Sequence, residues 1–228
     1  ATEEYNGSGW SLGGNLGTSR TSGAGFGTQT SAVMTAGRTG SSGPSDKQVT
    51  ATEEYDGSSW TSGGALGTAR RYLAGAGTLT SGLVFGGTVG GAPGGGTKQD
   101  ATEEYNGTSW TSGGALNSAA SSIGGTGASQ DAAISAGSGP PSTELYNGSS
   151  WTTGSAMNSA RAVVSLSGTS TAAIAAAGNP YVTSVENWNG SSWSVNPATL
   201  SSGRQASSNQ GTSTASIIAA GWSTSSPP

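Results

Sequence analysis

Five glutamates occupy the same position in five sequence repeats, and their carboxylates are the first candidates for a catalytic or cation-binding role. They are Glu3, Glu53, Glu103, Glu144 and Glu186, each two residues before an aromatic side chain. A ring of carboxylates offers acid–base catalysis or cation binding. Catalysis needs one distinct group, whereas five equivalent carboxylates are typical of a repeated structural contact. We therefore predict a structural role for all five.

Arginine recurs with these glutamates at a nearly constant distance from a tryptophan. Arg20, Arg70 and Arg161 stand ten residues after a tryptophan, and Arg204 stands eleven residues after one. A guanidinium group binds a carboxylate bidentately and keeps its charge in a low-dielectric site. The spacing predicts partly buried Glu–Arg pairs that brace the repeats. Ala120 replaces the arginine in the third repeat, so one glutamate should depend on backbone or water donors.

Two residue types that carry much of enzyme chemistry are missing from the sequence. The 228 residues include no histidine and no cysteine. This removes the usual general base, the thiolate nucleophile and the imidazole metal ligand. Hydrolysis by carboxylates alone would need two closely placed acids. We predict that the protein is not an enzyme and has no catalytic residue, no metal site and no cofactor.

A series of aromatic residues follows the glutamates. Its tryptophans are Trp10, Trp60, Trp110, Trp151 and Trp193. Such a series could form sugar-stacking platforms, but its fixed phase favours packing between neighbouring repeats, and we predict that these tryptophans are structural. Tyr72, Tyr181 and Trp222 fall outside this phase. They have no evident packing role in the repeat, so we predict that they belong to a ligand-binding site.

The elements that must position these residues are short strands. Each repeat divides into four segments bounded by Gly, Ser, Pro or Asn, as strands do, and no window shows a helical apolar period. Asn-Gly or Asp-Gly stands between the aromatic residue and the tryptophan in every repeat. This dipeptide predicts a hairpin with a type I′ turn and positive φ at both central residues. We predict an all-β fold: one domain over residues 1–228, with five repeats of about 41–50 residues and a flexible tail at 223–228.

The order of these features resembles the kelch repeat over essentially the whole chain. The residues that carry the resemblance are Gly86-Gly87, Glu53 with Tyr55, Trp60 and Arg70. The resemblance implies four-stranded blades in a β-propeller. The sequence departs from the kelch pattern in two ways. Most Gly pairs are reduced to Ala-Gly, as at Ala36-Gly37, and the turn between Tyr and Trp is shorter.

The phase of the repeats predicts how the propeller closes. The chain begins with the third and fourth strands of a repeat and ends with the first two, at residues 205–212 and 216–221. Pairing the two ends would complete a split blade, close a five-bladed ring and remove exposed strand edges. An open solenoid is the alternative. Near a narrow axis, Gly-rich stretches such as 25–27, 75–77 and 124–127 would leave room for crowded inner strands.

Unequal repeat lengths point to one face of the molecule as the binding face. Tyr5, Tyr55 and Tyr105 are 50 residues apart, whereas the next two repeats span 41 and 42 residues. The extra residues form loops at 38–50 and 88–100, on the face where the chain enters the next blade, and insertions on one face often bind ligands. Further candidate ligand-binding residues are Arg38, Asp46, Lys47, Arg71 and Lys98.

These observations favour a non-catalytic module for binding or display. The net charge is −4 and the eight basic residues are scattered, so we predict no nucleic-acid partner. No apolar stretch is long enough for membrane insertion. The Gly-, Ser- and Thr-rich repeats resemble those of bacteriophage tail-fibre and virion surface proteins. This implies an adhesion, receptor-binding or structural decoration role on a virion or in the extracellular space. The partner would be a cell-surface glycan or protein, or another virion protein. A soluble carbohydrate-binding lectin is the alternative, and a kelch-type protein-interaction scaffold is a second.

Overall fold

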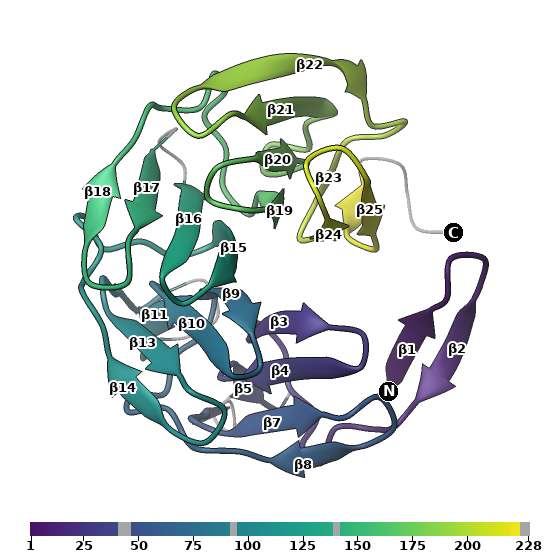
Figure 1. Ribbon diagram of the computed structural model, residues 1–228, viewed down its shortest axis with the longest axis vertical. Coiled ribbons are helices and arrows are strands. Elements are labelled where there is room, and N and C mark those ends of the chain that lie inside the picture. The colour runs from purple at the N-terminus through teal and green to yellow at the C-terminus, as the bar shows by residue number, and fades with distance from the viewer. Residues whose placement is uncertain (41–46, 92–94, 139–141, 224–228) are drawn as a thin grey trace.

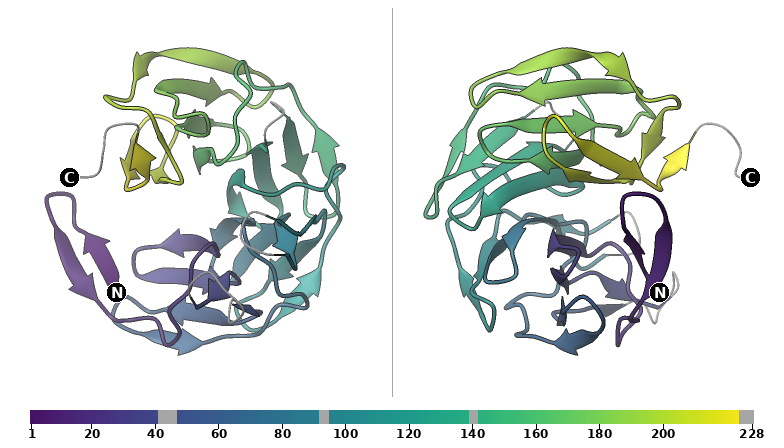
Figure 2. Two further views of the ribbon diagram at one scale, coloured as in Figure 1. Left: turned by 180° about the vertical axis from the view of Figure 1, so that it is seen from behind. Right: turned by 45° about the vertical axis from the view of Figure 1, so that its right-hand side comes forward.

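The computed structural model describes residues 1–40, 47–91, 95–138 and 142–223, and within these ranges every regular element is a strand. Four four-stranded antiparallel sheets stand around a central opening, and a two-stranded hairpin stands at each end of the row (Figure 1). The sheets are arranged like the blades of a propeller when the molecule is seen from behind and from the side (Figure 2). The fold is therefore all-β and propeller-like, as the sequence predicts.

The four complete sheets have the same strand order. The first contains β3 (Ala24–Thr28), β4 (Ser31–Thr35), β7 (Thr52–Tyr55) and β8 (Trp60–Ser62). The second contains β9 (Ala74–Thr78), β10 (Ser81–Phe85), β13 (Thr102–Tyr105) and β14 (Trp110–Ser112). The third contains β15 (Ile123–Ser129), β16 (Ala132–Gly137), β17 (Thr143–Tyr146) and β18 (Trp151–Thr153). The fourth contains β19 (Ser165–Gly168), β20 (Ala173–Ala176), β21 (Ser184–Trp188) and β22 (Trp193–Thr199).

The two ends of the chain form separate hairpins. β1 (Thr2–Tyr5) pairs with β2 (Trp10–Gly13), and β24 (Ser208–Gly211) pairs with β25 (Ser216–Ala219). The sequence of the N-terminal hairpin matches the third and fourth strands of the complete sheets. The C-terminal hairpin takes the place of the first and second strands of such a sheet. Together they supply the four strands of one further sheet, but each stands as a two-stranded sheet of its own.

Three short ladders extend from the sheets. They are β5 (Arg38–Thr39) with β6 (Lys47–Gln48), β11 (Thr88–Val89) with β12 (Thr97–Lys98), and β23 (Arg204–Gln205) with β26 (Trp222–Ser223). Isolated bridges join Thr21 to Arg38 and Arg71 to Thr88, so the two long loops lie beside the segments that enter the sheets. Ser223, the first residue of the tail predicted to be flexible, pairs with Arg204. The rest of that tail, 224–228, lies outside the described residues.

The turn between the aromatic residue and the tryptophan differs from the prediction. Tyr5 pairs with Trp10, so the loop has four residues, and of its Asn-Gly pair only Gly7 has a positive φ, of 97°. A type I′ turn, with positive φ at both central residues, is therefore wrong. The Asn6 side-chain oxygen instead accepts hydrogen bonds from the backbone N–H groups of Ser8 and Gly9, both at 2.9 Å. Asn and Asp favour this local contact in turns, which explains their recurrence here.

Glycine lets the inner strands approach one another around the axis. A Cβ atom at Gly75 would lie 2.9 Å from Cδ1 of Phe26 in the preceding sheet, and one at Gly125 would lie 2.5 Å from Cζ of Phe85. A side chain at either position would collide with that ring. The same stretches line a central channel of about 280 Å³, with backbone of 25–27, 75–77 and 125–127 on its wall.

Tryptophan and threonine join each sheet to the one before it. The indole N–H groups of Trp110, Trp151 and Trp193 donate 2.9 Å hydrogen bonds to the hydroxyl groups of threonines one sheet earlier. Trp60 makes the same bond to Thr2 of the N-terminal hairpin. These four tryptophans therefore pack between sheets. Trp10 differs, because 54% of its surface is exposed.

Tyrosine and a second glutamate form a parallel set of contacts. The hydroxyl groups of Tyr55, Tyr105 and Tyr146 donate hydrogen bonds to Glu4, Glu54 and Glu104, each one sheet earlier in the row. In the next sheet both partners change together: Trp188 replaces the tyrosine, and Leu145 replaces the glutamate and packs in the same apolar cluster. The contact is thus either polar or apolar on both sides. It is a second sheet-to-sheet joint beside the tryptophan–threonine bond.

These contacts predict unusual ionisation of two tyrosines. Burial, together with the hydrogen bond to Glu54, raises the pKa of Tyr105 from 10.0 to about 12, and burial with Glu104 does the same for Tyr146. A raised folded-state pKa favours the protonated folded form, so this stabilisation is complete below pH 10 and is lost as the pH rises towards 12. An ultraviolet titration of tyrosinate should show both late ionisations, and Tyr146→Phe should remove one of them. A titration in which every tyrosine ionises near its ordinary pKa would contradict the assignment.

The arginines and glutamates meet as buried pairs. Arg70 donates from Nη2 to the Glu103 carboxylate at 2.8 Å, and Arg161 and Arg20 bind Glu186 and Glu53 in the same way. All three guanidinium side chains are fully buried. Each arginine lies in the segment that enters a sheet, and its glutamate lies on the third strand of that sheet. The pair therefore fixes the entering segment to the sheet.

In the third sheet Ala120 stands in place of arginine, and an asparagine binds the glutamate, as Asn158 does beside Arg161 in the fourth sheet. Glu144 accepts hydrogen bonds at 2.8 Å from both the backbone N–H and the side-chain amide of Asn117. The amide also donates to the Trp151 carbonyl at 3.1 Å. A buried carboxylate needs hydrogen-bond donors when no cation is present, and one asparagine supplies two of them.

Candidate functional site

Five residues with left-handed backbone surround one mouth of the central axis. They are Ser22, Tyr72, Ser122, Val163 and Ala206, with φ of 60°, 57°, 55°, 54° and 54°. Each stands two residues after the repeated arginine position. We call this set the axial ring. Non-glycine residues rarely adopt this conformation, and it persists only where the surroundings enforce it.

Backbone hydrogen bonds link the axial ring from sheet to sheet. The N–H of Tyr72 donates to the Ser22 carbonyl at 2.8 Å, Ser122 donates to Tyr72 at 2.9 Å, and Val163 donates to Ser122 at 2.7 Å. These bonds run around the axis, across the boundaries between sheets. These bonds explain the positive φ. With this conformation the backbone N–H of each residue can donate to the preceding member of the ring while the chain continues into the first strand of its own sheet. The mouth of the axis therefore has a fixed rim.

The axial ring opens into a pocket of about 570 Å³, here called the axial pocket. Its lining residues are Ser22, Gly23, Tyr72, Leu73, Ser122, Ile123, Val163, Val164, Gln205, Ala206, Ser207 and Trp222. The volume falls within the range of about 300–1,000 Å³ that is common for small-molecule sites. Among the described residues, the lining combines aromatic rings, hydroxyl groups and one amide, and it includes no Asp, Glu, Lys or Arg.

Two of the aromatic residues predicted for ligand binding meet in the axial pocket, and the third lies behind it. Tyr72 and Trp222 both line it, and the Trp222 side chain is 72% exposed. Strand β26 holds the Trp222 backbone opposite Gln205. The Gln205 amide in turn donates to the Tyr181 hydroxyl at 3.1 Å, which connects Tyr181 to the pocket wall.

The buried Arg71 side chain packs against the ring of Tyr72. Its guanidinium carbon lies 5.5 Å from the centroid of the Tyr72 ring, within cation–π distance. The same guanidinium donates to the carbonyl groups of Gly91 and Gly95, at 3.2 and 3.0 Å. Arg71 is only 1% exposed. Its role here is therefore to join Tyr72 to the loop at 88–100, and its charge is not presented to solvent.

The other predicted ligand residues lie on the same face but outside the axial pocket. Lys47 and Lys98 are exposed, at the β6 and β12 ends of the two loop ladders, and Arg38 is partly buried in β5. Gln48 joins the two loops: its amide donates to the Gly90 carbonyl at 3.2 Å, and the Gly90 N–H donates back at 3.1 Å. Asp46 lies outside the described residues.

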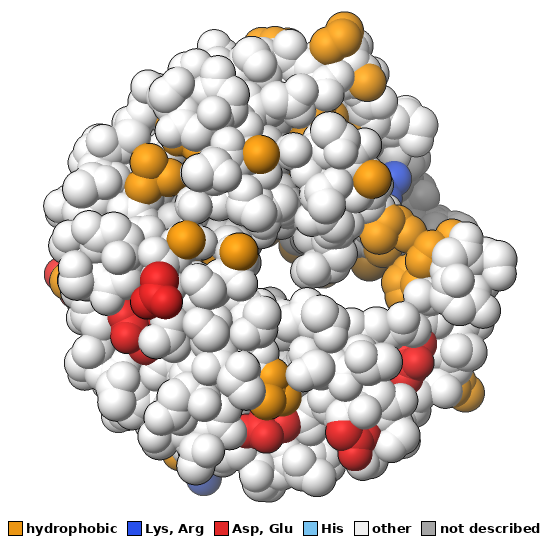
Figure 3. Space-filling view, viewed as in Figure 1, with side chains coloured by type: hydrophobic (Ala, Val, Ile, Leu, Met, Phe, Trp, Pro, Cys, Tyr) orange, Lys and Arg blue, Asp and Glu red, His pale blue; other side chains and the backbone are white. Residues whose placement is uncertain are grey.

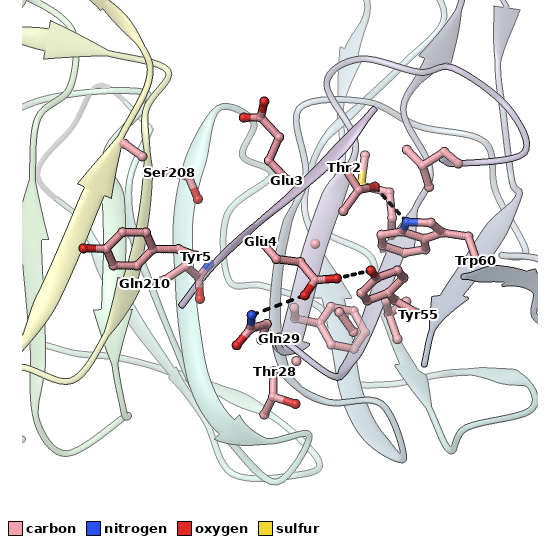
Figure 4. Close-up of a pocket in the computed structure, with 18 of the residues that line it drawn as sticks. Thr2, Glu3, Glu4, Tyr5, Thr28, Gln29, Tyr55, Trp60, Ser208 and Gln210 are labelled. Carbon is pink, nitrogen blue, oxygen red and sulfur yellow. Dashed lines mark hydrogen bonds between the residues drawn. The ribbon is translucent and has the colours of Figure 1, made fainter. Parts of the chain in front are cut away.

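A second pocket, of about 600 Å³, separates the two terminal hairpins. We call it the seam pocket. Its lining residues include Thr2, Glu3, Glu4, Tyr5, Trp10, Phe26, Gln29, Met34, Ser208, Gln210, Ile217 and Ala219. Figure 3 shows hydrophobic side chains gathered at this opening. Figure 4 shows that Glu4, from β1, bonds Tyr55 and Gln29, while Ser208 and Gln210 of β24 stand across the gap. The N-terminal hairpin is thus fixed to the first sheet, and the two line the seam pocket together with the C-terminal hairpin.

Among the described residues, Glu3 and Glu4 line the seam pocket, and no Asp or Glu lines the axial pocket. Within residues 1–40, 47–91, 95–138 and 142–223, no three His, Cys, Asp or Glu side chains are grouped as a metal site would need. In the same ranges no helix is long and apolar enough to cross a membrane. The two pockets offer packing and hydrogen bonding.

Sequence reasoning missed several residues of the axial pocket. Ser22 and Ser122 carried no signal beyond their constant distance from the arginine position. That distance could have identified the axial ring, but the side chains along it vary and none is glycine. Gln205 was missed because its role depends on the pairing of β23 with β26.

Comparison with known proteins supports the fold alone. No protein-family model matches the chain, and no curated protein matches it. One similar solved structure is described as "Structure of YjhT". It aligns with a TM-score of 0.70 and 15% sequence identity, over 92% of this chain and 75% of the other.

Proposed function

We propose that this chain is a non-catalytic recognition module: a closed five-bladed propeller of kelch-type repeats that binds its ligand at the axial pocket and displays it on one face. The observation that carries the proposal is the axial pocket itself, where an exposed tryptophan and a supported tyrosine meet on a hydrogen-bonded rim. The repeated glutamates support a non-catalytic role, because Glu53, Glu103 and Glu186 are occupied by arginine and none of the five lines the axial pocket.

The strand register supports closure of the ring. In every complete sheet a glycine of the inner strand is opposite one residue of the second strand, and that residue is opposite the aromatic residue of the third. One example is Gly77, Gly82 and Tyr105. In the C-terminal hairpin Gly211 is opposite Ser216. Extending the pattern pairs Ser216 with Tyr5, so β1 would add to β25 and complete a fifth blade.

Arg204 already makes one of the contacts that Arg70 and Arg161 make. Its Nη1 donates to the carbonyl of Ala220, sixteen residues on, at 3.2 Å. Arg161 makes the same bond to Ala177, also sixteen residues on and at 3.2 Å. Arg161 also binds the carbonyl two residues before its glutamate and the carboxylate of Glu186 itself. For Arg204 the equivalent partners are the Ala1 carbonyl and the Glu3 carboxylate. Both lie at the N-terminal hairpin, which closure of the ring would place beside Arg204.

The tyrosine joint supports the same closure. Tyr5 has the position of Tyr105, whose hydroxyl binds the residue that follows the repeated glutamate in the preceding sheet. For Tyr5 that residue is Asn187, whose side-chain oxygen can accept a hydrogen bond. Tyr5 is 37% exposed, whereas Tyr105 is fully buried. Closure would bury Tyr5 and fill the seam pocket with the side chains that line it.

Closure matters for recognition because it completes the rim. Ala206 has the same left-handed backbone as the rest of the axial ring, and it would continue the hydrogen bonds from Val163 back to Ser22. The axial pocket would then be enclosed by five entering segments. Its aromatic residues would be held in place before the ligand arrives, which lowers the entropy cost of binding.

Adhesion to defined surfaces tests the proposed function. The purified chain is passed over immobilised mucin-type glycoproteins, the same proteins after enzymatic removal of their glycans, and plain polysaccharides. We expect binding to at least one surface, and at least about tenfold weaker binding by Trp222→Ala, which corresponds to about 1.4 kcal/mol. Leu12→Ala is the matched control, because Leu12 is 80% exposed and remote from the axial pocket lining. Binding that Trp222→Ala leaves unchanged, or no binding to any surface, would overturn the proposal.

A further inference from the structure

We infer that the axial pocket takes a neutral oligosaccharide, with one sugar ring stacked on Trp222 and its hydroxyl groups bonded to the rim. This inference rests on the proposed function and names the ligand class of the same site.

The charge of the lining favours a neutral ligand. No acidic or basic side chain within the described part of the chain lines the axial pocket. Arg71 is close to Tyr72, but it is 1% exposed and its Nη2 donates to the backbone carbonyl groups of Gly91 and Gly95. An acidic sugar would therefore lose its hydration without gaining an exposed cation, and desolvating an unpaired charge is costly. A cationic peptide would find no carboxylate.

The aromatic surface suits the face of a sugar ring. Trp222 presents a flat apolar surface that is 72% exposed. One face of a pyranose carries mainly C–H groups, while its edge carries hydroxyl groups. A rigid aromatic plate can cover that face at low conformational cost, because tryptophan has only two side-chain torsions to fix. Tyr72 offers a second ring on the same pocket, with Arg71 holding it.

The polar groups of the rim suit the edge of a sugar ring. Ser22, Ser122 and Ser207 line the pocket with Gln205; the Ser207 hydroxyl also contacts that of Ser165 at 2.9 Å, and the Gln205 amide donates to Tyr181. Each hydroxyl both donates and accepts hydrogen bonds, as sugar hydroxyl groups do. A small set of convergent polar groups on an otherwise apolar wall is the usual arrangement of a specific small-ligand site. The axial pocket has this composition.

A glycan array followed by titration calorimetry tests the inference. The labelled full chain is applied to an array of neutral oligosaccharides and of matched glycans carrying sialic or uronic acids. We expect binding to a subset of neutral glycans, at least tenfold weaker binding by Trp222→Ala, and retention of most affinity by Trp222→Phe. Thermal unfolding of each variant, with Leu12→Ala as control, checks that the fold is intact.

The outcomes separate this inference from the proposed function. Equal or stronger binding of the acidic glycans would overturn the neutral class. Binding to deglycosylated protein that depends on Trp222 would also overturn it, while leaving the proposed recognition site in place. If the array shows no binding while adhesion to a protein surface depends on Trp222, the neutral-oligosaccharide inference is likewise overturned and the proposed recognition site is kept. Loss of Trp222 dependence in both experiments would overturn the inference and the proposed function together.

Discussion

Replacing Arg70 by alanine is expected to lower the free energy of unfolding by about 3–5 kcal/mol, because it leaves Glu103 buried without its cation. Arg70 is 0% exposed, and it binds the carbonyl groups of Gly86 and Ala101 as well as the carboxylate. Its removal therefore takes away three contacts at once. Chemical denaturation of the purified variant measures the loss. An unchanged unfolding midpoint would contradict the bracing role of the arginine.

The third sheet provides a matched rescue for this variant. There Ala120 stands at the arginine position, and Asn117 supplies two donors to Glu144. Gly67 has the position of Asn117, and its N–H already donates to Glu103 at 2.7 Å. Adding Gly67→Asn to Arg70→Ala should recover about 1.5 kcal/mol, the size of a hydrogen bond to a charged group. No recovery would mean that the asparagine is not what stabilises the third sheet.

A double-mutant cycle between Arg204 and Glu3 should give a coupling energy of about 0.5–3 kcal/mol, the range for residues in direct contact. The expectation follows from closure, which would place Glu3 where Glu186 stands relative to Arg161. A second cycle, between Arg204 and Glu4, is the control. Glu4 has the same charge but binds Tyr55, on the other side of the hairpin. It should couple weakly, at no more than a few tenths of a kcal/mol.

Equal coupling in the two cycles would indicate general electrostatics rather than a specific pair. Coupling near zero in both would indicate that the two hairpins remain apart in solution. Measurements at low and moderate salt strengthen the comparison, because exposed charges are screened more than buried ones.

The repeated features of the fold could be predicted because local chemistry sets them. Asn-Gly or Asp-Gly marked each outer hairpin, and the spacing of Arg70 after Trp60 anticipated a buried pair with a repeated glutamate. The turn type was predicted wrongly, because the Asn6 side chain caps a four-residue loop and replaces a two-residue turn. Side-chain capping of this kind competes with the backbone geometry that dipeptide rules assume.

The axial pocket could be predicted only in part, because it depends on contacts between distant repeats. Tyr72 and Trp222 were identified as aromatic residues outside the repeat phase, but nothing local placed them in one pocket. The axial ring was missed because its left-handed backbone is set by hydrogen bonds from the neighbouring sheet and not by glycine. The pairing of Tyr105 with Glu54 had a signal, since Leu145 and Trp188 change together in the fourth contact.

The central claim, that the two terminal hairpins complete a fifth blade and so close the ring around the axial pocket, can be tested by a disulfide. The natural sequence has no cysteine, so Thr2→Cys with Ala219→Cys introduces one defined pair. The equivalent positions in the first sheet, Thr35 and Thr52, pair directly with side-chain oxygens 2.8 Å apart. Cysteines at Thr35 and Thr52 serve as the positive control, and Tyr5→Cys with Ala219→Cys tests the wrong register.

Mass spectrometry of the monomer after mild oxidation gives the answer. We expect the Thr2–Ala219 cysteine pair to form an intramolecular disulfide as readily as the control pair and to raise the melting temperature, while the misregistered pair does not. Free thiols in the Thr2–Ala219 variant under conditions that oxidise the control, or bonds formed only between molecules, would contradict the closed ring.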